Sequence, residues 1–284
     1  MPSSKRQSSV TQSGDDTSAA SSATSMIVLW KLVVADIGAP DWASANSPVR
    51  TLPLQSRAMA IDLWWASGSP YSWRVMLALE HKRLPYDSHS LQLAFQEHKA
   101  PQMLAMNPRG RVPVLKHDDY VVFESVAILY YLDRKYPDPP IFGRTPEEAA
   151  VIVRVIEEFQ AYTEPHIMGI CRTLLGGANP LEEPPLGADA LTDAMHVVAR
   201  EARTIEMRVS RFDWIVGDDY SAIDMVIFPA IQLLRRALGR PGAEDLARRF
   251  LPIEVNYPAL GRWLARIEAL PGYDRTFPPH WRPD

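Results

Sequence analysis

The chain has 284 residues, of which 46% are hydrophobic and 23% are charged, and its formal net charge is -4. These values are typical of a soluble globular protein with one large or two modest domains, and no stretch gathers enough Lys and Arg for a nucleic-acid surface. The single cysteine, Cys171, excludes an intramolecular disulfide framework and a cysteine-based metal cluster, and it indicates a reducing compartment.

The spacing of the histidines and the length of the apolar runs indicate neither a metal site nor a membrane span. The seven histidines are scattered with no pair at metal-ligand spacing, so we expect no metal. The longest apolar run, Met26 to Ala35, is cut by Lys31 and falls short of the ~20 residues that a membrane span needs. The Ser- and Thr-rich segment before it is a poor start for a signal peptide, so we expect a cytoplasmic protein without membrane or nucleic-acid partners.

Residues 1–58 differ from the rest of the chain. They are Ser-rich, then weakly hydrophobic, then interrupted by Pro40, Pro48 and Pro53, without a sustained helical or strand period. We expect either a disordered leader or an over-extended reading frame whose natural start is Met59. Both alternatives remain open.

Residues 59–137 alternate between strand and helix patterns. The expected elements are a strand at 61–65, a helix through 73–79, strands at 86–91, 112–116 and 120–123, and a helix at 124–136. The polar stretch 117–119 makes an antiparallel hairpin of the last two strands. The order, βαβ followed by ββα, predicts a small mixed sheet covered by helices.

Residues 138–144 read as a linker, and residues 145–284 predict an all-helical domain. Thr145 and Glu148 form a capping box with Pro146 at the first helical position. We expect a loop at 174–187, a long helix at 189–212, a helix that starts at Ser221, and a last helix that opens at 256–258.

Four segments resemble the cytosolic glutathione transferases. Ser69-Pro70-Tyr71-Ser72 has the shape of a thioredoxin-type Cys-x-x-Cys turn with oxygen in place of both sulfurs, between a strand and a helix. With the three residues that follow it, this turn makes the segment 69–75, which resembles the first of the family's three glutathione-site segments. Residues 107–115 and 124–125 resemble the other two, and residues 221–224 resemble the family's helix-start motif in the helical domain. The resemblance covers Ile61 to the C-terminus. It implies a thioredoxin-like glutathione-binding domain followed by an all-helical domain, and the Ser-Pro-aromatic turn is similar to the serine-type tau and zeta classes and to the omega class, with no class assigned.

The resemblance implies a catalytic role for Ser69. A thiol with a pKa of about 8.5 is only roughly 3% thiolate at neutral pH, and lowering that pKa by about 2 units takes ~2.7 kcal/mol of preferential interaction with the anion. A hydroxyl donor at a helix N-terminus supplies much of this. The alternative is that Ser69 only caps the helix. Ser67 is a further hydroxyl nearby, and we expect Ser72 to face inward.

The resemblance also implies residues that bind glutathione. Val112, before Pro113, would pair with the cysteinyl backbone, the alternative being a plain edge-strand proline. Ser125 would take the γ-glutamyl carboxylate and Glu124 its ammonium group, the alternative being a helix cap with a solvated glutamate. Cations stand where the family binds the glycyl carboxylate, although either is equally a surface charge: Lys99 and Arg111.

The second-substrate pocket is expected between Ser69 and the first helices of the helical domain. Its candidate lining residues are Tyr71, Tyr162 and His166, together with Met168 and Arg172, and ordinary helix packing is the alternative for each. Cys171 is expected to be a buried apolar side chain.

The function expected from the resemblance is that of a glutathione transferase, with glutathione as co-substrate and a small apolar electrophile as its partner. A glutathione-dependent isomerase, dehalogenase or ether-cleaving enzyme on the same site is the alternative, as is a non-catalytic binding module. The family also implies a homodimer.

Overall fold

The structure is a computed structural model that describes residues 60–176 and 184–282. The leader or extension expected over residues 1–58 lies outside the described residues, as do residues 177–183 of the loop expected at 174–187. No helix of the described ranges has both the length and the apolar character needed to cross a membrane.

A four-stranded mixed sheet forms the first half of the described chain. Its strands are β1 (Ile61–Trp65), β2 (Asp87–Ser90), β3 (Val114–His117) and β4 (Tyr120–Phe123), in the order β2-β1-β3-β4. Strand β1 is parallel to β2 and antiparallel to β3, and β4 is antiparallel to β3. Along β1, the side chains of Ile61, Leu63 and Trp65 are buried, as the period of two in a half-covered strand requires. The predicted βαβ-ββα order is confirmed.

Two helices connect and cover these strands: α2 (Pro70–His81) and α4 (Ser125–Lys135). Between β2 and β3 the chain forms three short helical turns, η1 (Leu93–Phe95), η2 (Glu97–Lys99) and α3 (Pro101–Met106), that the periodicity did not predict. Elements of three to six residues are too short to show a helical period. A second difference is His117, predicted to lie in the turn but buried at the end of β3.

The linker is tied to the sheet half by a buried ion pair. Lys82 Nζ lies 3.2 Å from Asp133 Oδ1 and donates to the carbonyl oxygens of Tyr136 and Pro139 at 2.7 and 2.6 Å. Asp133 Oδ1 also accepts a hydrogen bond from the backbone N–H of Ile141 at 2.8 Å. The chain therefore leaves the sheet half along a fixed path.

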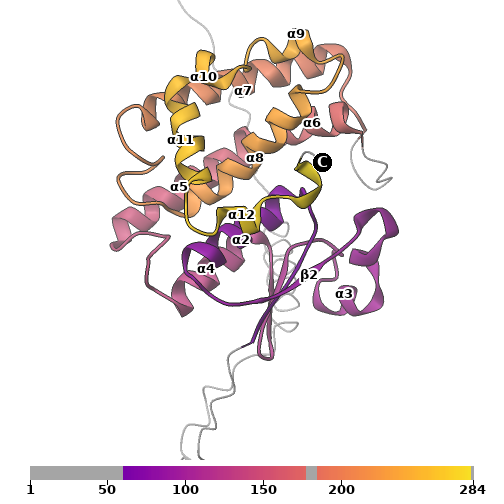
Figure 1. The fold of residues 1–284 in the computed structure, drawn as a ribbon, viewed down its shortest axis with the longest axis vertical. Helices are drawn as coiled ribbons and strands as arrows, with labels where there is room; N and C mark the ends of the chain where they lie inside the picture. Colours follow the sequence, from indigo (N-terminus) through magenta and orange to yellow (C-terminus); the bar gives the residue numbers. More distant parts are fainter. Residues whose placement is uncertain (1–59, 177–183, 283–284) are drawn as a thin grey trace, which may run out of the picture. The chain divides into compact units, whose positions relative to one another are not determined.

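The second half of the described chain is helical, as predicted. Its elements are α5 (Pro146–Tyr162), α6 (Glu164–Leu175), α7 (Ala188–Val209), α8 (Ala222–Leu238), α9 (Glu244–Ala247), α10 (Ile253–Asn256), α11 (Pro258–Glu268), α12 (Tyr273–Thr276) and η3 (Pro279–Trp281). The capping box of Thr145 and Glu148 at the start of α5 is confirmed. The prediction that the helix opening at 256–258 is the last one is wrong, because α12 and η3 follow α11 and return to α2 (Figure 1).

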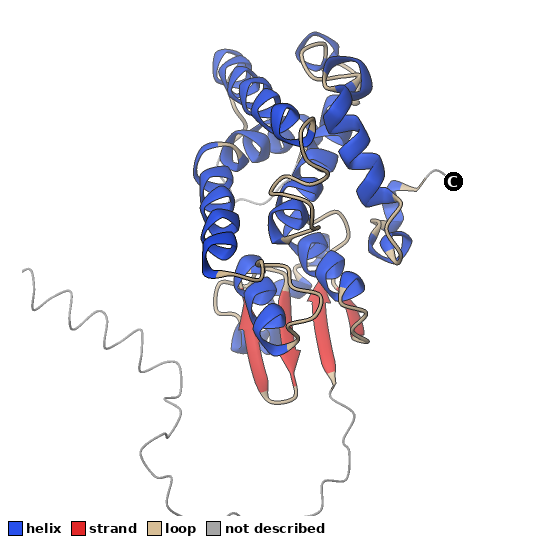
Figure 2. Cartoon of the chain, turned by 90° about the vertical axis from the view of Figure 1, so that its left-hand side faces the viewer, coloured by secondary structure: helices blue, strands red, loops and turns tan. Residues whose placement is uncertain are grey.

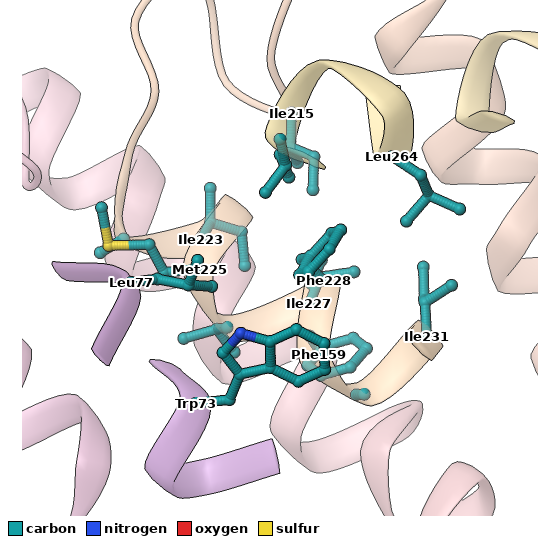
Figure 3. Packing of buried hydrophobic residues seen from close by; sticks show 14 of the residues in the cluster. Trp73, Leu77, Phe159, Ile215, Ile223, Met225, Ile227, Phe228, Ile231 and Leu264 are labelled. Carbon is teal, nitrogen blue, oxygen red and sulfur yellow. The ribbon is translucent and has the colours of Figure 1, made fainter. Parts of the chain in front are cut away.

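Helix α8 is the centre of the hydrophobic core, with nearly every side chain from Ala222 to Leu234 buried. Helix α2 packs against both α8 and α4, so it joins the sheet half to the helical half (Figure 1). Figure 2 shows the strands gathered at one end of the described chain, with helices over the rest. Figure 3 shows Trp73 and Leu77 of α2 among side chains of α8 that include Phe228. The rings of Trp73 and Phe228 meet edge to face with centroids 5.4 Å apart. The described chain is thus a thioredoxin-like domain packed on an all-helical domain.

Candidate functional site

Three of the segments singled out in the sequence meet at one end of the strands, where β1 and β4 finish and β3 begins; we call this end the sheet edge. Trp64 of β1 pairs with Val114 of β3, which pairs on its other side with Phe123 of β4. Because β1 and β4 both run antiparallel to β3, the ends of β1 and β4 lie beside the start of β3. The loop 66–69, the dipeptide 112–113 and the dipeptide 124–125 therefore come together, although up to 59 residues of sequence separate them.

Ser69 is the N-cap of α2. Its φ and ψ of -72° and 116° are those of extended backbone, and its Oγ accepts a hydrogen bond from the N–H of Ser72 at 3.3 Å. The capping role weighed for Ser69 is therefore present. It does not use up the side chain, because a hydroxyl has one proton to donate besides its lone pairs. Ser69 is half-buried and can reach a ligand at the helix N-terminus.

Ser72 faces inward, as predicted. It is 1% exposed, and its Oγ accepts a hydrogen bond from the backbone N–H of Ala66 at 3.4 Å. This bond ties the first turn of α2 back to the end of β1. Of the serines in and beside the turn, Ser67 and Ser69 are the half-buried ones.

The peptide bond between Val112 and Pro113 is cis. The loop before it is held by Asn107, which is buried. Its Nδ2 donates to the carbonyl oxygen of Arg111 at 2.9 Å, and its Oδ1 accepts from the N–H of Arg109 at 3.1 Å. One asparagine side chain thus bridges both sides of the turn. Val112 itself is half-buried, two residues before β3 begins.

Lys99 and Arg111 lie at this same turn. Lys99 Nζ donates to the carbonyl oxygen of Arg109 at 3.0 Å, and its side chain lies across Gly110, where a Cβ atom would come within 2.7 Å of it. Arg111 is exposed. Arg109, a further cation that was not singled out from the sequence, lies at the same turn, and its Nη1 is 3.3 Å from Glu124 Oε1. The turn is therefore a small basic surface, suited to a carboxylate.

Glu124 has a backbone conformation unusual for a side chain other than glycine. Its φ is +69° and its ψ is 115°, at the residue that links β4 to α4. Such a conformation costs about 1–3 kcal/mol and persists where the surrounding structure imposes it, often at a ligand site. The Glu124 side chain is 62% exposed, so its carboxylate is available to a ligand.

Ser125 begins α4 and is buried, and a buried arginine holds it. Arg74 of α2 is 0% exposed, and its Nη1 donates to Ser125 Oγ at 3.2 Å. Its Nη2 forms an ion pair with Glu164 of α6, and its guanidinium stacks over the Tyr71 ring with 4.8 Å to the centroid. Among the residues the structure describes, its Nε is buried without a hydrogen-bond partner. Arg74 lies two residues after the Ser69–Ser72 turn, and a charged side chain inside an otherwise apolar helix is the signal in the sequence that it needs a partner.

The three candidate lining residues of a second-substrate pocket lie on α2, at the end of α5 and on α6. Tyr71 packs beside Arg74 on α2, and His166 is half-buried in the first turn of α6. Tyr162 is 67% exposed at the end of α5 and lines a cavity of about 350 Å³ between α5, α7 and α8. The residues lining that cavity come from the helical half, whereas Ser69 lies at the sheet edge. Tyr162 therefore lines a cavity to which Ser69 does not contribute.

The chain's last described residues reach the same sheet edge as Ser69. Ser67 Oγ and His280 Nδ1 lie 2.6 Å apart, and a Cβ atom on Gly68 would come within 2.9 Å of the His280 ring. The sequence reading assigned no role to His280, because a histidine 213 positions from Ser67 carries no local signal. Cys171, by contrast, is buried as predicted, and burial raises the pKa of its thiol, which disfavours the thiolate form. Within the described ranges, no group of three or more His, Cys, Asp or Glu side chains is placed to hold a metal.

Known proteins share both the sequence pattern and the fold. The family described as glutathione S-transferase, N-terminal domain, matches residues 63–140. Glutathione S-transferase A of Pleuronectes platessa is 27% identical over 229 residues, which are 79% of this chain and 94% of that protein. Glutathione S-transferase F13 of Arabidopsis thaliana is 30% identical over 171 residues, which are 59% of this chain and 77% of that protein.

A solved structure is similar over almost its whole length. The crystal structure of a glutathione S-transferase from the Antarctic clam Laternula elliptica superposes with a TM-score of 0.65 at 25% identity. The match covers 78% of this chain and 94% of the clam protein. Both halves of the described chain therefore have counterparts in one known architecture.

Proposed function

This chain belongs to the glutathione transferase family, and from that premise we propose that Ser69 stabilises the thiolate of bound glutathione for attack on an electrophile. The observation that carries the proposal is the meeting of three segments at one sheet edge, with Ser69 at the N-terminus of α2. The protein is a glutathione S-transferase, so a thiolate must form at its site. The turn has no sulfur of its own, and a hydroxyl is therefore the group that can hold the sulfur of the tripeptide.

The geometry of Ser69 suits a thiolate. Its oxygen accepts from the Ser72 N–H, which polarises the hydroxyl and leaves the Ser69 proton to donate to sulfur. A charge-assisted hydrogen bond contributes about 1.5–3 kcal/mol, and the dipole of the 12-residue helix α2 adds to it. Together these supply the ~2.7 kcal/mol that lowers a thiol pKa by about 2 units.

The remaining contacts of glutathione follow from its peptide chemistry. Val112, before the cis bond to Pro113, would pair its backbone with the cysteinyl residue in the manner of an added strand. Ser125 and the N-terminus of α4 would receive the γ-glutamyl carboxylate, and the exposed Glu124 carboxylate would pair with the ammonium group. Lys99 and Arg111, on the basic turn, would take the glycyl carboxylate. Arg109 is a further cation for it.

The electrophile is proposed to be small and apolar. Tyr71, Tyr162 and His166 remain candidates for its pocket, with Tyr71 favoured because it lies two residues from Ser69 on α2 and its ring is half-buried. Isomerisation, dehalogenation and ether cleavage use the same thiolate and stay as alternatives. A role in detoxification, a homodimeric assembly and a cytoplasmic location are proposed with the family, and the single buried cysteine suits a reducing compartment.

The substitution Ser69→Ala tests the proposal. We expect turnover with a chromogenic aryl halide to fall roughly 10²-fold or more while the glutathione KM changes less, because the lost contact is to the anion. The pKa of the bound thiol, followed by ultraviolet absorbance of the thiolate, should rise by about two units.

Two controls separate chemistry from folding. Ser69→Ala also removes a helix cap, which costs about 1 kcal/mol, so urea unfolding of the variant must be measured beside its activity. Ser69→Thr keeps a hydroxyl and should keep most of the thiolate. An unchanged thiol pKa in Ser69→Ala would remove Ser69 from the mechanism.

A further inference from the structure

The C-terminal segment places a histidine against the loop that carries Ser69. His280, in η3, lies over Gly68, and its Nδ1 is 2.6 Å from the Oγ of Ser67. Gly68 has a φ of +80° and lacks a Cβ atom that would meet the imidazole at 2.9 Å, so the ring can approach the backbone closely. Ser67 and Ser69 are the residues on either side of this glycine.

The neighbouring tryptophan determines which nitrogen of His280 carries the proton. Trp281 Nε1 donates to His280 Nε2 at 3.0 Å. An indole N–H is only a donor, so Nε2 must be the acceptor and the neutral imidazole must carry its proton on Nδ1. The Nδ1–H therefore donates to Ser67 Oγ, and the hydroxyl proton of Ser67 is left to donate elsewhere.

The segment that presents His280 is anchored to the core. Trp281 meets Trp73 edge to face with centroids 5.6 Å apart, and the Arg236 guanidinium of α8 lies 5.1 Å from the centroid of the Trp281 ring. Thr276 of α12 accepts a hydrogen bond from Trp73 Nε1 at 2.9 Å. Burial, with the nearby Arg236, lowers the pKa of His280 and so favours the neutral ring that the chain of hydrogen bonds requires.

We propose that Ser67 is a second hydroxyl donor to the glutathione sulfur, and that His280 is the positioning residue that directs its proton. The chain of donors runs from the Trp281 indole through His280 to Ser67, and each bond polarises the next. The proposal rests on the proposed function, because the acceptor at the end of the chain is the thiolate that Ser69 also holds.

The test is a titration of the bound thiol in four variants, read by thiolate absorbance with glutathione alone. His280→Leu removes the donor, and we expect the pKa of the bound thiol to rise by about one unit, which is a tenfold loss of thiolate below that pKa. His280→Asn places an amide N–H near the position of Nδ1 and should restore most of the wild-type value. Ser67→Ala should raise the thiol pKa by as much as His280→Leu. The double variant that combines Ser67→Ala with His280→Leu should raise it no further.

The outcomes separate this proposal from the role of Ser69. An unchanged thiol pKa in His280→Leu, with a raised one in Ser69→Ala, would overturn the proposal and leave Ser69 in place. Equal effects of His280→Leu and His280→Asn would also overturn it, because packing on Gly68 would then be the cause. No effect of Ser69→Ala beside clear effects of Ser67→Ala and His280→Leu would support the proposal and refute the role of Ser69. His196→Leu, at an exposed histidine of α7, is the matched control, and glutathione bound to this variant should have the same thiol pKa as in the wild type.

Discussion

Arg74 determines where Ser125 lies, although it is buried and would not touch glutathione. Its guanidinium connects three parts of the chain: α2, the start of α4 and the start of α6. A buried ion pair adds little net stability over an apolar pair, but breaking it leaves one charge without compensation. Arg74 is therefore better understood as a determinant of geometry than of stability.

The prediction at this site separates those two roles. Arg74→Met should lower the free energy of unfolding by about 3–5 kcal/mol, because it leaves the Glu164 carboxylate buried and unpaired. The double variant with Glu164→Leu should recover most of that loss. The glutathione KM should be higher than that of the wild type in the single variant, because Ser125 has lost the hydrogen bond that Arg74 donates. It should remain as high in the double variant, which does not restore that bond. A KM that recovers together with stability would contradict a positioning role for Arg74. Urea unfolding and initial rates measure the two effects.

Individual residues could be predicted from the sequence where the signal was local. The sequence indicated that Ser72 faces inward, because it lies in the first turn of a helix, and that Cys171 is buried, because a free cysteine behaves as a small apolar side chain. It could not find the partners Glu164 or His280, which lie 90 and 213 positions from the residues they contact. Nor could it foresee the positive φ of Glu124, because that conformation is imposed by the strand before it and the helix after it.

Helices α5 and α8 both begin with a capping box, and the structure shows that the two boxes are unlike. At α5, Thr145 Oγ1 accepts from the Glu148 N–H at 3.2 Å on the surface. At α8, Asp224 is 0% exposed and accepts from the N–H groups of Ile215 and Ser221, the Ser221 hydroxyl and the Trp263 indole. Burial raises the pKa of Asp224, while these four hydrogen bonds oppose the shift.

We expect the two caps to differ in their contribution to stability. Thr145→Ala should cost about 1 kcal/mol, the usual value of an exposed cap. Asp224→Ala should cost about 3 kcal/mol or more, because it leaves several buried donors without an acceptor. Urea unfolding of both variants gives the comparison directly. Equal losses would show that Asp224 acts only as a helix cap.

Most long elements could be predicted, and most short ones could not. Strands with alternating burial and helices with caps carry a period, and β1, α4 and α5 follow it closely. The helices α3, α9, α10 and α12 have four to six residues, too few for a period, and their places depend on what they pack against. The error at the C-terminus has this cause, since α12 is held by Trp73 rather than by its own sequence.

At the scale of the whole molecule, His81 marks the contact between the two halves. It lies near the end of α2, and its ring meets the Tyr220 ring, just before α8, at a centroid distance of 5.0 Å. Burial, followed by the charges of Lys82 and Arg83, lowers the pKa of His81 to about 4. The folded protein therefore keeps His81 neutral at a pH where the unfolded chain already binds a proton.

This difference predicts a loss of stability in mild acid. Between pH 6.5, the ordinary value for histidine, and pH 4, the unfolded state binds more protons at this site, so stability falls as the pH falls. The effect of this one group should be on the order of 2 kcal/mol after allowance for solvent screening. His81→Gln should flatten the curve in that window, whereas His196→Leu should not. Urea midpoints measured from pH 7 to pH 4 test this, and parallel curves for wild type and His81→Gln would refute it.

The division into a mixed-sheet domain and a helical domain followed from the order of the elements along the chain. The way in which the halves join did not, because a helix that is buried on nearly all sides, as α2 is, does not show which face meets which partner. Trp73 alone touches Phe228, Tyr273, Phe277 and Trp281. Such contacts are a property of the assembled core.

The lone cysteine has a practical consequence. Cys171 lies in α6 at 4% exposure, and the sequence contains no other thiol. A thiol-specific reagent can therefore modify the native protein only when α6 opens. The labelling rate consequently reports how often the helical core opens locally. The same protection means that a cysteine introduced at a surface position would accept a fluorophore without prior removal of a native one.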